Sequence, residues 1–144
     1  MALRDALTDP QKSSAIVSDC CTLIDEEVAS KGGFGGLAVK AGYGVVKGIK
    51  PGFVREVVQK LLPEFADQLD PIWAEAKTGG NATQAFVAQK GRVADALLSV
   101  TDGKAKNAKS GAVRGAYDKL RGSAKKNVED AVPRLAGLLV KHGG

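Results

Sequence analysis

The chain is poor in the residues on which most catalytic and metal sites depend. Its 144 residues include one histidine, His142, and two cysteines, Cys20 and Cys21. A serine or cysteine nucleophile needs a neighbouring base, and a structural zinc site needs about four ligands. One imidazole close to the end of the chain meets neither requirement. We therefore expect no enzyme activity, no metal site and no cofactor.

Long apolar runs and aromatic side chains are also scarce. No segment approaches the roughly eighteen consecutive apolar residues of a membrane-spanning helix, and an acid at Asp5 interrupts any secretory signal at the start. Aromatic residues make up only 5% of the chain. Adjacent cysteines in a helix point about 100° apart and cannot easily bond to each other. We expect a cytoplasmic protein with small side chains, including both thiols, in its core.

Glycine, by contrast, is concentrated between Lys31 and Phe53, which hold eight of the 18 glycines. Beneath them, the spacing of apolar residues from 37 to 49 predicts a helix, and Leu37, Ala41, Gly44 and Gly48 share one narrow face. Each interior glycine costs about 1 kcal/mol relative to alanine. Close packing against another helix would offset that cost. This stretch is therefore predicted to be the buried centre of the fold.

A bound ligand is the alternative explanation of the same glycines. A flat ligand would lie against the glycine face, with an anion at the amino end of the helix and lysines nearby. The glycine spacing also matches a dinucleotide-binding turn, but the segment before it is predicted to be a helix and not the required strand. The candidate ligand-binding residues are Gly35, Gly36, Lys40, Tyr43 and Lys47.

The remaining pattern predicts an all-α fold. Apolar residues recur at helical spacing along most of the chain, and proline or glycine separates the segments. Pro63 and Pro71 are expected to divide an apolar region into short angled helices, and Pro133 to cause a kink or a restart. We expect one compact domain, residues 1–144, made of about six to eight helices. Residues 103–110 are predicted to be a mobile basic loop, and residues 141–144 a frayed tail.

Positive charge gathers in the second half of the chain. Residues 1–72 carry 8 basic and 10 acidic groups, whereas residues 73–144 carry 13 and 6. Eight basic groups and one acid lie between Gly103 and Lys126. This asymmetry favours an anionic partner, although a solvated helix face would also explain it. The predicted basic face comprises Arg114, Lys119, Arg121, Lys125 and Lys126, with Lys119 and Lys126 opposite the other three.

Three functions remain open on these observations. The first is a homo-oligomeric interaction or scaffold module whose basic helix meets a nucleic acid or an anionic membrane surface. The second is a carrier of a small ligand or lipid that uses the glycine-rich helix. The third is nonspecific nucleic-acid binding through phosphate contacts. A steep dependence of binding on salt would favour the third function, and a co-purifying small molecule the second.

Several local patterns resemble a known family. They are Asp25-Glu26-Glu27-Val28, Lys31-Gly32-Gly33, Lys50-Pro51-Gly52-Phe53, Leu61-Leu62-Pro63 and the segment Arg121-Gly122-Ser123-Ala124-Lys125-Lys126. Together they are similar to a family of small bacterial proteins with an uncharacterised domain. The resemblance covers most of the chain and implies a compact helical domain. It implies no activity and no site residues.

Overall fold

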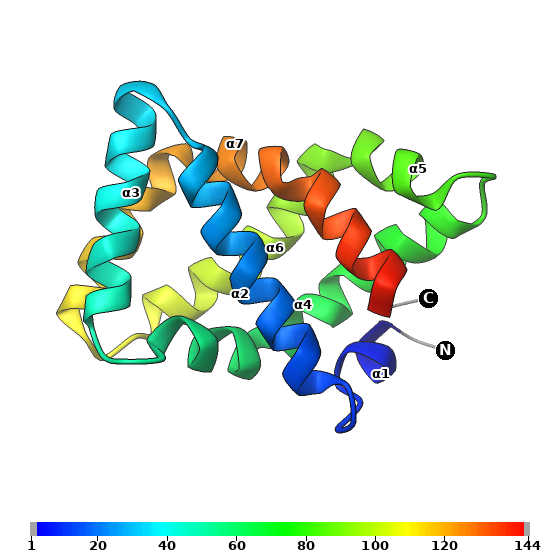
Figure 1. Cartoon of the computed structure of the whole chain (residues 1–144), viewed down its shortest axis with the longest axis horizontal. Helices are drawn as coiled ribbons and strands as arrows, with labels where there is room; N and C mark the ends of the chain where they lie inside the picture. The colour runs from blue at the N-terminus through cyan, green and yellow to red at the C-terminus, as the bar shows by residue number, and fades with distance from the viewer. Residues whose placement is uncertain (1–2, 143–144) are drawn as a thin grey trace.

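A computed structural model describes residues 3–142 of the chain, apart from the side chains of residues 33–35. Every regular element in this part is an α-helix, as the sequence predicts (Figure 1). The seven helices are α1 (Leu3–Leu7), α2 (Ser13–Ser30), α3 (Gly33–Gly48), α4 (Phe53–Lys77), α5 (Ala82–Ala88), α6 (Lys90–Lys106) and α7 (Gly111–His142).

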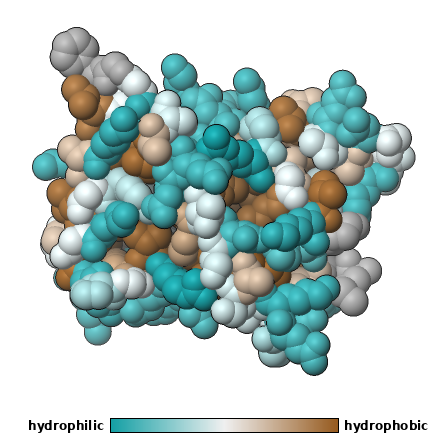
Figure 2. Space-filling view, viewed as in Figure 1, coloured by the Kyte–Doolittle hydropathy of each residue, from teal (hydrophilic) through white to brown (hydrophobic). Residues whose placement is uncertain are grey.

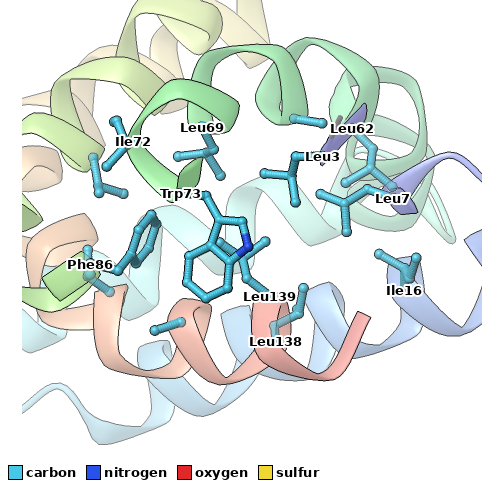
Figure 3. Packing of buried hydrophobic residues seen from close by; sticks show 14 of the residues in the cluster. Leu3, Leu7, Ile16, Leu62, Leu69, Ile72, Trp73, Phe86, Leu138 and Leu139 are labelled. Carbon is cyan, nitrogen blue, oxygen red and sulfur yellow. The ribbon is translucent and has the colours of Figure 1, made fainter. Parts of the chain in front are cut away.

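The core is built around α4. This helix packs directly against α1, α2, α5 and α6, and its buried side is continuous with apolar residues of α7. Trp73 of α4 is 2% exposed and meets Phe86 of α5 edge to face, with ring centroids 5.4 Å apart. Figure 3 shows Leu139 of α7 lying against the same indole ring. Trp73 therefore anchors the core, although its indole N–H has no hydrogen-bond partner in the described structure.

Two long helices contain prolines, which corrects the prediction of short angled segments. Pro63 and Pro71 lie inside α4, which runs for 25 residues, and Pro133 lies inside α7, which runs for 32. A proline within a helix costs about 3 kcal/mol because it removes a hydrogen bond and crowds the preceding turn. Burial of apolar side chains on both sides of each proline offsets this cost. Tertiary packing thus overrides the local preference.

The glycine-rich helix lies at the edge of the molecule, not at its centre. Figure 1 shows α3 at one end of the long axis, where it packs mainly against α7 and α2. Leu37 and Val45 are 64% and 50% exposed, and no atom lies within 4 Å of where a Cβ would stand at Gly44 or Gly48. The predicted face of Leu37, Ala41, Gly44 and Gly48 does form on α3, but it faces solvent. Val39 and Gly42, on the other side of the helix, are buried instead.

Close packing is found at two other glycines of α3. A Cβ on Gly42 would stand 2.6 Å from Cδ2 of Leu120 in α7, and one on Gly36 would stand 2.6 Å from the carbonyl carbon of Lys31. Helix α2 ends in extended backbone at Lys31 and Gly32, and neither residue has a positive φ. Gly52, before α4, is the one described residue with a positive φ, 74°.

Two segments predicted to be loose are partly helical in the structure. Residues 103–106 form the last turn of α6, and the Asn107 side chain donates a hydrogen bond to the Gly103 carbonyl, so the connection is only residues 107–110. Residues 141 and 142 end α7, while residues 143–144 lie outside the described part. His142 Nε2 lies 2.6 Å from Asp19 Oδ2, and this contact with α2 anchors the end of α7. Asp19 lies too far from His142 in the sequence for a local pattern to indicate this contact.

Two alanine substitutions in α3 test this account of its glycines. Gly36→Ala brings its methyl group against the Lys31 backbone, so we expect a loss of about 1–3 kcal/mol of unfolding free energy. Gly44→Ala meets open space and removes an interior helix glycine, so we expect a gain of about 0.5–1 kcal/mol. Urea unfolding of both variants measures the two changes. A fold centred on the glycine face would instead be destabilised by Gly44→Ala.

Candidate functional site

Four of the five basic residues predicted on α7 fall into two groups, and Arg114 stands apart from both. Arg121 and Lys125 turn toward α6, where each meets an acid. Arg121 Nε and Nη2 donate to Asp102 at 2.9 and 3.2 Å, and Lys125 Nζ lies 3.2 Å from Asp95. These two cations are neutralised within the chain, so they contribute less to the attraction of an external anion.

Asp102 holds a polar cluster between α6 and α7. It accepts hydrogen bonds from Arg121 and from the Tyr117 hydroxyl, which also lies 2.8 Å from Thr101 Oγ1. The hydrogen bond from Arg121, followed by that from Tyr117, lowers the pKa of Asp102 below its ordinary value. Burial, aided by the bond to Asp102, raises the pKa of Tyr117 to about 12. The cluster is fully paired and ties the two helices together.

Lys119 and Lys126 form the second group and lie on the outer side of α7. Both are exposed, and neither makes an ion pair or a hydrogen bond within the described residues. They stand two helical turns apart, about 10 Å along the axis. Gly115 and Gly122 lie on the same side and have open space beside them. We call this set the α7 outer stripe: Gly115, Lys119, Gly122 and Lys126.

The start of α7 adds further positive charge. Lys106 is the last residue of α6 and Lys109 lies in the short connection to α7, and both are exposed without an ion pair in the part of the chain described. Lys104 is different, because its Nζ lies 3.2 Å from Glu64 of α4. Arg114 donates to the Ala108 carbonyl and so holds the connection in place. The basic region therefore has two parts, the outer stripe and this connection.

The candidate ligand residues of α3 do not enclose a site. Tyr43 turns toward α2, where its hydroxyl donates to Asp25 at 2.5 Å. Lys47 lies 3.9 Å from the same carboxylate and 5.3 Å from the Tyr43 ring centroid. Burial, with the bond to Asp25, raises the pKa of Tyr43. Lys40 is exposed and unpaired within the described chain.

Of the two candidate glycines, Gly35 and Gly36, only Gly36 has surroundings that the structure describes. Gly36 packs against the backbone of Lys31, which leaves no room for a ligand on that side. The surroundings of Gly35 lie outside the described residues. The helix begins at Gly33, four residues before the predicted start at residue 37, and Lys31 at the end of α2 takes the space beside Gly36.

Several other ionisable side chains are paired or partly buried. The pKa of Asp19 is lowered, first by its hydrogen bond with His142 and then by Lys141, and these contacts join α2 to the end of α7. Burial raises the pKa of the Cys20 thiol to about 11, so it stays protonated. In the described chain no cluster of histidine, cysteine or carboxylate side chains suits a metal ion. No described helix is long and apolar enough to cross a membrane.

An open cleft of about 490 Å³ lies between α4 and α6. Its lining is mostly polar and contains none of the residues that the sequence pointed to on α3 or on α7. The residues that line it are Glu64, Asp67, Gln68, Ser99, Val100, Gly103, Lys104 and Asn107.

The Asp102 cluster predicts how stability depends on pH. A carboxylate whose folded-state pKa is lowered stabilises the fold above its unfolded value of about 3.9, and that contribution is lost as the pH falls through the folded-state pKa. We expect Asp102→Asn to lower the melting temperature at neutral pH, with the difference from wild type shrinking below about pH 4.

Melting curves over a pH series measure this difference. Asp118→Asn is the control, because Asp118 is an exposed acid on α7 that makes no ion pair in the described structure. A difference for Asp102→Asn that stays constant from neutral to acid pH would contradict the assigned role of the carboxylate.

Comparisons with known proteins place the chain in a family. Neither the curated proteins nor the solved structures contain a match to it. A family model described as a family of unknown function, DUF6918, matches residues 3–143, which is nearly the whole chain. This agrees with the resemblance seen in the sequence. The chain therefore belongs to the family of unknown function DUF6918.

Proposed function

We propose that the protein is a non-enzymatic docking module that binds a partner with closely spaced negative charges. Its contact surface consists of the α7 outer stripe and the connection that bears Lys106 and Lys109. One observation carries the proposal: Lys119 and Lys126 are exposed and unpaired within the described residues, whereas Arg121 and Lys125 on the same helix are held by Asp102 and Asp95.

The shape of the stripe supports binding to an extended anionic surface. Gly115 and Gly122 leave the helix flat beside the two lysines, so a surface can approach the backbone closely. The charge of the whole chain, +5, acts in the same direction by attracting a polyanion over a longer range. The internally paired residues keep α6 and α7 in a fixed arrangement beneath this surface.

A location in the cytoplasm, expected from the sequence, is part of this proposal. The cytoplasm offers two large classes of anionic surface, nucleic acids and the acidic lipids of the inner leaflet of the membrane. Binding through lysine to either class weakens as salt is added, because ions screen the attraction.

Retention of the protein on a column of immobilised heparin, which is a polyanion, tests the proposal. In the variant Lys119→Glu/Lys126→Glu we expect affinity at low salt to fall at least about tenfold, since each lysine near an anionic surface is worth about 1 kcal/mol. The matched control is Lys60→Glu/Lys90→Glu, which changes net charge equally. Lys60 and Lys90 are exposed residues of α4 and α6 that make no ion pair in the described chain.

The control variant distinguishes binding through the α7 outer stripe from retention that depends only on the net charge of the protein. We expect the control variant to elute close to the wild-type protein, and both variants to keep wild-type helical content by circular dichroism. Equal losses in the two variants would mean that net charge alone drives retention, and no retention of the wild-type protein would reject the proposed function.

A further inference from the structure

The outward side of α3 is an apolar surface that no other part of the described chain covers. We call it the α3 outer face, and it carries no charged residue. Leu37 and Val45 are 64% and 50% exposed, and they are two of four large apolar side chains exposed in the described structure. Figure 2 shows apolar residues among polar ones at this end of the molecule. The α3 outer face consists of Leu37, Ala38, Ala41, Gly44, Val45 and Gly48.

Lysines border this face on one side. Lys40 and Lys47 are seven residues apart and so lie within about 20° of each other around the helix. Both are exposed, and Lys47 lies 3.9 Å from Asp25 and 5.3 Å from the Tyr43 ring centroid. The connection between α6 and α7, with Lys106 and Lys109, lies at the same end of the long axis as α3 (Figure 1). An exposed apolar strip and unpaired cations therefore occur together at one end of the molecule.

Shape and charge together distinguish the occupants that this surface would accept. A second copy packed antiparallel on α3 would bring the two lysine borders to the same side, where like charges repel. The face measures roughly 17 Å by 10 Å from helix geometry, well below the roughly 800 Å² per partner of a stable interface. A nucleic-acid backbone would meet the lysines but would leave Leu37 and Val45 without an apolar environment.

An anionic lipid bilayer satisfies both halves of the surface. We propose that α3 docks the protein onto the surface of an anionic bilayer, with its outer face toward the lipid. Leu37 and Val45 enter the boundary between headgroups and acyl chains, while Lys40 and Lys47 extend to the lipid phosphates. Flat glycines bring the helix backbone close to the headgroups. The electrostatic half of this inference rests on the proposed function, and the apolar half rests on α3 alone.

Sedimentation with vesicles of equal parts phosphatidylglycerol and phosphatidylcholine tests the inference. We expect the wild-type protein to bind these vesicles and not pure phosphatidylcholine vesicles. Leu37→Ser/Val45→Ser should partition at least about tenfold more weakly, because two apolar side chains lose their burial in the lipid. Both side chains are exposed in the free protein, so this variant should fold normally.

A matched pair of single variants locates the effect. Val45 and Val140 are 50% and 53% exposed, and Val140 lies near the end of α7, far from α3 along the long axis (Figure 1). Val45→Ser should weaken vesicle binding, and Val140→Ser should leave it unchanged. Equal effects of the two substitutions, or equal binding of the wild-type protein to both kinds of vesicle, would overturn the inference.

Two further readouts separate this inference from its alternatives. Leu37→Ser/Val45→Ser should be retained on heparin like the wild-type protein, because its lysines are intact. Wild-type retention on heparin without vesicle binding would reject the membrane while leaving the proposed function in place. A sedimentation-velocity result in which the wild-type protein is a dimer and this variant a monomer would instead make the face a self-interface and overturn the inference.

Discussion

Burial of the apolar side of α4 around Trp73 is the interaction on which the rest of this structure depends. Five other helices bring side chains to that core, from Leu3 in α1 to Leu139 in α7, and none of the buried residues described is polar or charged. The strength of this packing explains how α4 continues through two prolines. It also leaves the described charged groups at the surface, where ion pairs within the chain determine which of them can still bind a partner.

Ion pairs between helices sort those charges. Carboxylates of α6 hold Arg121 and Lys125, while acids of α2 face the carboxyl-terminal half of α7, where Arg134 and Lys141 approach them. Individual surface pairs of this kind add little stability. Their larger effect here is to orient α7, so that Lys119 and Lys126 are left on its outer side. The proposed docking surface is thus defined by which partners its neighbours find within the chain.

The glycines of α3 divide in the same way between internal and external roles. Gly36 and Gly42 face inward and allow close contact with Lys31 and Leu120, so their small size serves the fold. Gly44 and Gly48 face solvent beside Leu37 and Val45, where their cost to the helix has no compensation inside the described chain. A partner outside the chain would supply that compensation, which is the physical link between the fold and the proposed bilayer contact.

The sequence by itself determined the all-α class and some helix ends, because these depend on local physics. The cap at Asn81, whose side chain accepts from the Gln84 N–H, and the break at Gly52 follow from short-range backbone preferences. Periodicity also grouped the side chains that share a helix face. Only the tertiary structure decided which face of α3 is covered, that α4 and α7 continue through their prolines, and that His142 meets Asp19 from 123 residues away. Those outcomes depend on contacts between distant segments, and no local pattern encodes them.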